Sequence, residues 1–206
     1  MPVSMASMSD SARTRVKDGA AWRIGDEGDV AWISSRPGVA ITAAIPPVFA
    51  DYATLVLPGE TGGPRETTEE RAQDRALLAL LETHTAPQPW WLGYLETGAS
   101  DIVFWDAPKL KLYSDWSYVL VQAGPAQAAS WRPANGWSNW KSTELPELMF
   151  PDDRSWLIST LWDDDWTCIG GSTTLVAGLL ADSSLGRRAR RVSVEQDATP
   201  PGHAAR

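Results

Sequence analysis

Three consecutive carboxylates, Asp163, Asp164 and Asp165, are the most distinctive candidate for chemistry in this chain. They lie between Trp162 and Trp166, inside an otherwise apolar segment. Carboxylates so close together could bind a metal ion or a basic partner. The calcium loop of helix–loop–helix proteins, however, spaces its acidic ligands at alternate positions with a glycine at the sixth, and this segment has neither feature. Aspartate is also well suited to turns, because its carboxylate accepts backbone hydrogen bonds and its backbone tolerates left-handed geometry. We interpret the triplet as a hairpin turn, with a partner-facing acidic tip as the alternative and no metal assigned.

Two registers are open for this hairpin. A three-residue loop would set Trp162 opposite Trp166 as a cross-strand aromatic pair. A two-residue loop would set Trp162 opposite Asp165 and send the two indoles to opposite faces, because a shift of one residue reverses every side chain. The sequence does not choose between them.

The surplus of tryptophan provides the other candidate binding residues. Tryptophan occurs 12 times, whereas phenylalanine occurs 3 times and tyrosine 4 times. Large aromatic side chains dominate the energetics of both cores and interfaces. Five tryptophans lie in apolar strand patterns that predict core positions: Trp22, Trp32, Trp105, Trp156 and Trp166.

Four further tryptophans are candidate contact residues. Trp90 and Trp91 are adjacent in one predicted strand, so their side chains must face opposite ways and only one can lie on a single core face. Trp137 and Trp140 lie in the polar loop 132–144, where burial is not predicted. Exposed indoles recur at hot spots of protein interfaces, and they can also stack on sugar rings. The alternative, in which this loop folds back and buries both indoles, stays open.

The sequence shows no catalytic constellation. With two histidines and one cysteine, neither a structural zinc site nor a Cys–His couple is predicted. Cys168 lies inside a predicted strand and is expected to be a small buried hydrophobe. The segment Gly170-Gly171-Ser172 is explained by the exit of a strand and the cap of a helix, since it lacks the Lys-Ser/Thr ending of a phosphate-binding loop. We expect no cofactor, and we leave open whether the protein is an enzyme.

Length and composition indicate one acidic globular domain. The chain has 206 residues, a hydrophobic fraction of 43% and a formal net charge of −8. Nonspecific nucleic-acid binding needs Lys and Arg gathered on one face, so no nucleic-acid partner is predicted. The first residues lack the apolar run of a signal peptide, and no apolar stretch reaches 18 residues, so we predict a cytoplasmic location and no membrane partner. A single cysteine excludes an internal disulfide.

Two main helices are predicted. Over residues 67–84, Thr67 and Glu70 have the spacing of a capping box. The same segment carries one apolar stripe at helical spacing: Leu77, Leu80, Leu81 and His84. A second helix is expected over residues 172–182, with Ser172 as its N-cap.

The remaining elements are expected to be short strands. WWLGYLETG, DIVFWDAP, KLKLY and YVLVQAG alternate with turn residues, which predicts an antiparallel meander. Farther upstream, Asp26-Glu27-Gly28-Asp29 is a turn signal between two short apolar runs and predicts a hairpin within residues 21–34.

These elements predict a single α+β domain over residues 21–185. A mostly antiparallel sheet should be covered on one face by the two helices. Residues 1–20 are polar and without periodicity, and residues 186–206 contain the basic run RRARR and two prolines, so both are predicted to be disordered tails.

One segment carries a resemblance. PDDRSWLISTLWDDDWTCIGG, together with AAIPPVFADYA and WWLGYLETG, resembles a group of uncharacterised proteins from actinobacteria. The likeness covers most of residues 21–203, its most distinctive part is the acidic hairpin, and it implies no catalytic residues. The architecture and the use of tryptophan are also similar to those of the SMI1/KNR4-like immunity proteins, which are α+β domains that bind partner proteins, but only as an analogy between folds.

These patterns together predict a noncatalytic module that binds or regulates another protein. The candidate contact residues are Trp137, Trp140, Trp90, Trp91, Asp163, Asp164 and Asp165. The alternative is a carbohydrate-binding protein or a glycoside-active enzyme that uses exposed tryptophans and a pair of its 26 acidic residues. The oligomeric state is not predicted.

Overall fold

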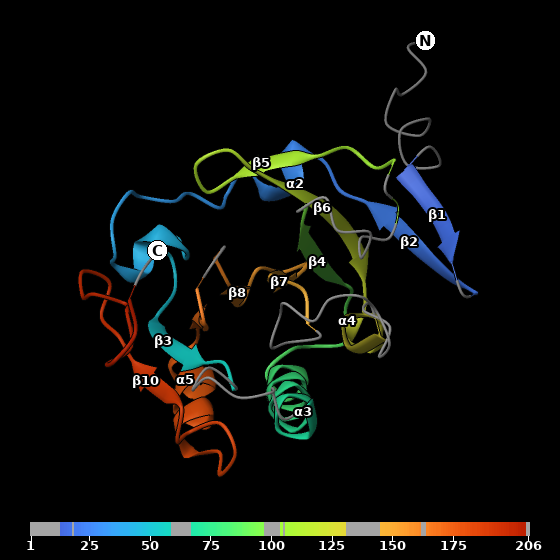
Figure 1. Cartoon of the computed structure of the whole chain (residues 1–206). Coiled ribbons are helices and arrows are strands. Elements are labelled where there is room, and N and C mark those ends of the chain that lie inside the picture. The colour runs from blue at the N-terminus through green and yellow to red at the C-terminus, as the bar shows by residue number, and fades with distance from the viewer. Residues whose placement is uncertain are drawn as a thin grey trace.

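One antiparallel sheet organises the chain (Figure 1). A computed structural model describes residues 13–17, 19–58, 67–96, 104, 106–130, 145–161 and 164–204. The strands in these ranges are β1 (Thr14–Lys17), β2 (Ala20–Ile24), β3 (Asp51–Val56), β4 (Trp90–Leu95), β5 (Leu110–Leu112), β6 (Trp116–Ala123), β7 (Leu148–Pro151), β8 (Leu157–Ser159), β9 (Trp166–Gly171) and β10 (Ala189–Arg191). The helices are α2 (Glu27–Val30), α3 (Thr67–Thr83), α4 (Pro125–Ser130) and α5 (Thr173–Ala181), with a 3-10 turn η1 (Ile41–Ala43). The predicted α+β class and the antiparallel sheet are confirmed.

The strand order brings distant segments together. Across the described sheet it runs β1-β2-β6-β4-β7-β8-β9-β3-β10, and β5 pairs with β6 outside this path. The central pairs β6–β4 and β4–β7 set Gln122 opposite Trp91 and Trp91 opposite Phe150. The expected meander is therefore only partly local, because β4 pairs with β6 and β7 and not with β5.

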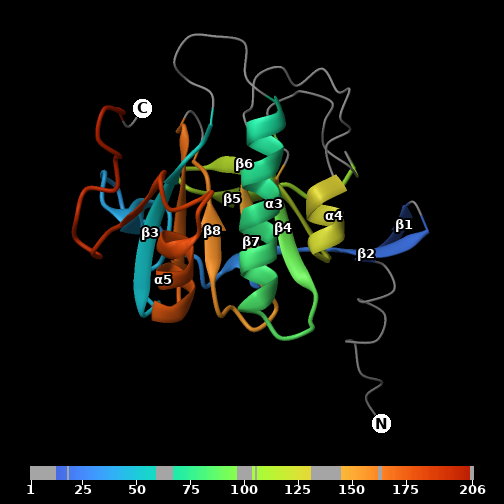
Figure 2. The same ribbon diagram turned by 90° about the horizontal axis from the view of Figure 1, so that it is seen from below.

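Both faces of the sheet are buried. Figure 2 shows α3, α4 and α5 lying across one face, where they close a helix-side core that includes Trp90 and Trp156. The opposite core includes Trp91 and Trp166 and is covered by η1, β5 and segments near the C-terminus. The predicted helical cover on one face is thus accompanied by a second cover made of short pieces.

The tryptophans with predicted core positions divide into three groups. Trp22, Trp156 and Trp166 are buried, with exposed fractions of 1–4%. Trp32 is half-buried and meets the edge of Phe150, with ring centroids 5.2 Å apart. Trp105 lies outside the described residues.

The two main helices form from local signals and pack on each other. Ser172 accepts a hydrogen bond from the Leu175 backbone N–H at 3.1 Å, so the predicted N-cap of α5 is confirmed. Gly178, an unfavourable residue inside a helix, lies where α5 meets α3. A Cβ atom there would come within 3.0 Å of Leu80 Cδ1 and 3.4 Å of His84 Nε2. Close approach of the helices therefore explains this glycine.

The predicted hairpin within residues 21–34 is wrong. β2 ends at Ile24, and Asp26 then caps the short helix α2 instead of opening a turn between two strands. Its side chain accepts from the Gly28 N–H, while Asp29 accepts from the Asp26 N–H. Aspartate serves turns and helix caps by the same hydrogen bond, which is why the sequence signal was ambiguous.

The predicted tails also differ from the structure. Residues 14–17 belong to the segment that was expected to be disordered, but they form strand β1, which pairs with β2. At the other end, β10 pairs with β3, and residues 192–204 follow it as a C-terminal strap over the opposite core. In this strap Val192 and Ala198 are buried, with exposed fractions of 1% and 4%.

The basic run is held by partners that the sequence does not reveal. Arg188 forms an ion pair with Glu69 of α3, and Arg191 forms one with Asp51 at the start of β3. Arg190 donates to the backbone carbonyls of Asp197 and Thr199, at 2.9 and 3.0 Å. These side chains attach the strap and β10 to the domain, and the prediction of a disordered tail over 186–206 is wrong for residues 186–204.

Removal of the C-terminal strap tests this correction. Deletion of residues 192–206 should lower the free energy of unfolding by about 2 kcal/mol or more, because burial of one valine side chain contributes about 1.5–3 kcal/mol. Urea unfolding followed by tryptophan fluorescence measures the change. Deletion of residues 205–206 alone is the control and should leave the midpoint unchanged. Equal stability of the two shortened chains would show that the strap does not contribute to the core.

Candidate functional site

The adjacent tryptophans Trp90 and Trp91 point to opposite faces of β4, as predicted, but both are buried. Their exposed fractions are 2% and 3%. Trp90 meets Trp156 edge-on in the helix-side core, with ring centroids 4.9 Å apart. Trp91 stacks on Phe150 in the opposite core at 6.3 Å. Neither indole offers its face to a ligand, so both act in packing.

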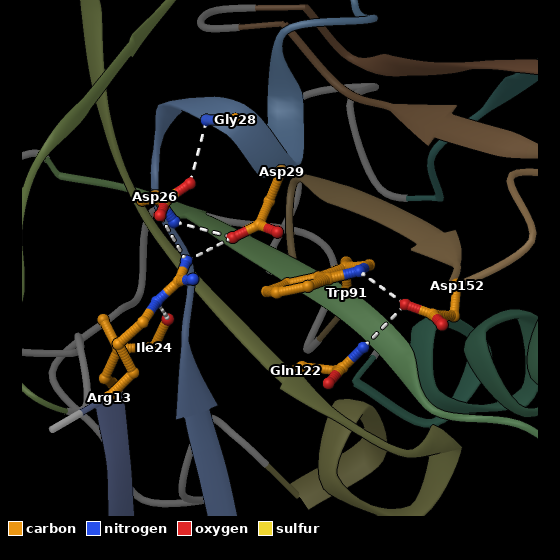
Figure 3. Close-up of polar contacts among 8 residues, drawn as sticks. All are labelled: Arg13, Ile24, Asp26, Gly28, Asp29, Trp91, Gln122 and Asp152. Carbon is orange, nitrogen blue, oxygen red and sulfur yellow. Dashed lines mark hydrogen bonds and ion pairs between the residues drawn. The ribbon is translucent and has the colours of Figure 1, made fainter. Parts of the chain in front are cut away.

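Trp91 lies at the centre of a polar cluster that joins three strands and a turn (Figure 3). Its indole Nε1 donates to Asp152 Oδ1 at 3.2 Å, and Gln122 Nε2 donates to the same oxygen at 2.8 Å. Arg23, paired with Gln122 in the sheet register, places its guanidinium carbon 5.2 Å from the centre of the Trp91 ring. Asp152 thus fixes the turn after β7 on the aromatic surface, while Arg23 covers the ring by a cation–π contact.

A second cluster in Figure 3 is centred on Arg13. Its guanidinium Nη2 lies 2.8 Å from Asp26 Oδ2 and 2.6 Å from Asp29 Oδ2. Its Nε donates to the Ile24 carbonyl at 3.0 Å. The two carboxylates that cap α2 are therefore also the anchor for the residue just before β1. Sequence reasoning missed both clusters, since no local signal links Arg13 to Asp29 or Trp91 to Asp152.

One residue of the acidic turn, Asp165, makes contacts within the protein. Asp165 Oδ2 lies 2.7 Å from His203 Nδ1, and the His203 ring meets Trp166 edge-on at 6.2 Å. The Asp165 carbonyl accepts from the Leu57 N–H at 2.8 Å. His203 was expected in a disordered tail, yet the strap brings it to the turn. Of the described carboxylates, Asp165 is therefore an anchor, and Asp164 is half-buried beside it.

The register of the hairpin is observed only below its tip. Ser159 pairs with Cys168 and Ile158 with Ile169. This register differs by one residue from the register that would set Trp162 opposite Trp166. Trp162 and Asp163 themselves lie outside the described residues.

The polar loop with Trp137 and Trp140 also lies outside the described residues, but its point of entry is defined. Five neighbouring strands end or begin on this side of the sheet, and we call this side the loop end. Its residues are Val56, Leu95, Glu147, Thr160 and Trp166. The described hydrogen bonds hold this edge together: the Leu95 N–H donates to Glu147 Oε2 at 3.2 Å, and the Thr160 N–H donates to the Glu147 carbonyl at 2.7 Å. Val56 pairs with Trp166 in the sheet.

The segment 131–144 joins the described chain just before Glu147, and residues 162–163 join it just after Leu161. Both sequence-predicted contact segments are therefore attached at the loop end.

The described residues do not assemble a metal site. Among them, no group of three His, Cys, Asp or Glu side chains lies close enough to hold a metal ion. Cys168 is buried, and burial raises the pKa of its thiol to about 12, so the thiol is protonated at neutral pH. Its expected role as a small buried residue agrees with this environment.

Comparisons with known proteins give no relative: no family model, no curated protein and no solved structure matches the chain. Within the ranges that the structure describes, none of the helices has both the length and the apolar character to cross a membrane.

Replacement of Asp152 tests the polar cluster at Trp91. Asp152→Ala should lower the free energy of unfolding by about 1–3 kcal/mol, because the indole N–H and the Gln122 amide lose their acceptor. Asp152→Asn keeps an Oδ1 acceptor and should remain near the wild type. Urea unfolding of the three proteins measures the difference. Equal stability of the alanine and asparagine variants would show that the hydrogen bonds do not hold the turn.

The environment of Cys168 predicts an unreactive thiol. At pH 8 a thiol with a pKa near 12 is ionised to a fraction on the order of 10⁻⁴. A thiol-specific chromogenic reagent should therefore not react with the folded protein during the time in which it reacts fully with protein unfolded in guanidinium chloride. Rapid stoichiometric reaction of the folded protein would contradict the burial of this side chain.

Proposed function

We propose that the protein is a noncatalytic module that binds or regulates another protein, and that its contact surface is at the loop end. The observation that carries the proposal is the attachment of two candidate contact segments to this one edge. The segment with Trp137 and Trp140 enters the sheet at Glu147, and the acidic turn follows Thr160 on the neighbouring strand.

Packing of the other tryptophans supports this choice. Trp22, Trp90, Trp91, Trp156 and Trp166 are all buried in the two cores, with exposed fractions of 4% or less. Their abundance is explained by the need to fill two cores, so they provide no ligand surface. Trp137 and Trp140 remain as the candidate contact indoles, and tryptophan is among the residues most enriched at binding hot spots.

A rigid base at the loop end favours a protein partner. Glu147 is 3% exposed, and its backbone and side chain link β4 to β8. Asp165 is fixed by His203 and by the Leu57 N–H. Contact segments that leave a preorganised edge lose less conformational entropy on binding. The adjacent carboxylate of Asp164 would complement a basic group on the partner.

The test uses the double variant Trp137→Ala/Trp140→Ala. Tagged wild-type protein should retain a specific partner from cytosol, whereas the double variant should lose it, because truncation of a hot-spot tryptophan costs about 2 kcal/mol or more. Val48→Ala is the control: Val48 is 67% exposed and precedes the start of β3, at the sheet end opposite Val56. Circular dichroism and thermal melting should confirm that all three proteins fold.

A glycan panel separates the sugar-binding alternative. Intrinsic tryptophan fluorescence of the wild type should stay unchanged across the panel if the partner is a protein. Retention of the same partners by the double variant would refute contact through this loop. A saturable fluorescence change with one glycan would refute the protein-binding proposal and favour a carbohydrate ligand.

A further inference from the structure

A tight turn near the C-terminus returns the chain to the sheet. The His203 N–H donates to the Pro200 carbonyl at 3.1 Å, and Gly202 has a φ of +85°. Proline at the second position and a glycine with positive φ at the third are the pattern of a type II turn. Pro201 presets the backbone for this turn, and glycine adopts the left-handed conformation without steric cost. The local sequence Pro-Pro-Gly-His thus places His203 by its own backbone preferences.

This turn brings the His203 side chain to the loop end. Its Nδ1 lies 2.7 Å from Asp165 Oδ2, and its ring meets Trp166 edge-on, with ring centroids 6.2 Å apart. The His203 and Asp165 side chains keep exposed fractions of 23% and 25%, so solvent reaches the contact. An ion pair in such surroundings changes an equilibrium constant by roughly fivefold or less. The contact is therefore weak enough for another basic group to replace it.

The main part of the strap is held by contacts that do not involve His203. The Ala198 N–H donates to the Val39 carbonyl at 2.8 Å, and the Val192 N–H donates to the Tyr52 carbonyl at 3.0 Å. The side chains of Val192 and Ala198 are both buried. Loss of the His203 contact would thus leave this part of the strap in place.

The segment after Pro200 depends on His203. Pro200 is buried, whereas three of the four residues described after it are exposed. The fourth is His203, whose side chain makes the contact with Asp165. Release of this one side chain would therefore free residues 201–204 from the domain without any loss of buried apolar surface from the strap.

Asp165 keeps its place in the sheet whether or not His203 is bound. Its carbonyl accepts from the Leu57 N–H at 2.8 Å, and the next residue, Trp166, pairs with Val56 in the ladder between β3 and β9. These backbone contacts do not depend on the carboxylate. Opening of residues 201–204 would thus change the availability of the Asp165 carboxylate and not the strand that carries it.

We propose that residues 201–204 are a latch at the loop end, in which His203 occupies the Asp165 carboxylate until a basic group of the protein partner displaces it. The identity of this competitor rests on the function proposed above. With the latch closed, as in this structure, Asp165 is engaged within the chain. With the latch open, its carboxylate is added to the contact surface beside Asp164. The C-terminal turn thereby regulates access to the surface that binds the partner.

Substitution of the turn glycine tests whether the latch opens independently of the strap. A Cβ atom at Gly202 would meet no described atom within 4 Å, so Gly202→Ala acts through the left-handed backbone alone. Hydrogen exchange of the His203 N–H, measured by NMR at one fixed pH, should accelerate by roughly 5–30-fold. Exchange of the Ala198 and Val192 N–H groups should stay unchanged. Equal acceleration of all three would overturn an independent latch.

Gly19→Ala is the matched control for this substitution. Gly19 also has a positive φ, +76°, and open space around it, but it lies between β1 and β2, at the sheet edge opposite β10. This variant should leave the exchange of the His203 N–H at the wild-type rate. An acceleration as large as that of Gly202→Ala would show that the effect does not arise in the turn, and would refute the latch.

A basic peptide tests displacement without the natural partner. Hexalysine, compared with sodium chloride of equal ionic strength, should accelerate exchange of the wild-type His203 N–H severalfold and leave the Ala198 N–H unchanged. In Asp165→Asn the His203 N–H should already exchange fast and should not respond to hexalysine. No response of the wild type would refute displacement. Because these readouts need no partner protein, they are independent of the Trp137→Ala/Trp140→Ala test, and failure of the latch is distinguished from failure of the proposed function.

Discussion

Burial of both faces of a single sheet is the constraint on which this structure depends. Side chains alternate along a strand, so β4 must send Trp90 into one core and Trp91 into the other. Helices α3, α4 and α5 cover the first face, and no helix of comparable length remains in the described chain for the second. The second face is instead closed by η1, β5 and the C-terminal strap, which bury side chains such as Ile41 and Val192.

Short covering segments have few backbone hydrogen bonds of their own, so side-chain contacts must hold them. The described polar contacts do this: Arg13 binds the carboxylates that cap α2, whose Val30 is buried in the opposite core, and Arg190 binds carbonyls of the strap. Near its end the strap is held by His203 against Asp165. Charged residues that read as surface or tail in the sequence are therefore attachment points for the cover of the opposite core.

The sequence predicted what local signals encode. The stripe on α3, the Ser172 cap of α5 and the pairing of β8 with β9 all follow from neighbouring residues. Errors arose where one local signal serves two structures, as at Asp26, or where partners are distant. The run RRARR has the composition of a solvated tail, and only the fold brings Glu69 to Arg188, 119 positions away. Pairing over such a separation has no signature in a single sequence.

The same distinction applies to the candidate contact residues. Trp90 and Trp91 were correctly expected on opposite faces, but a second core could not be foreseen because segments far apart in the chain build it. Asp165 had the character of an exposed turn carboxylate, yet His203 engages it from 38 positions away. Of the seven candidate residues, Trp90 and Trp91 are thus buried in the two cores, and Asp165 is held by His203. The remaining candidates are Trp137, Trp140, Asp163 and Asp164, and the segments that carry them join the described chain at the loop end. The proposed contact surface therefore rests on the residues for which the described contacts assign no packing or anchoring role.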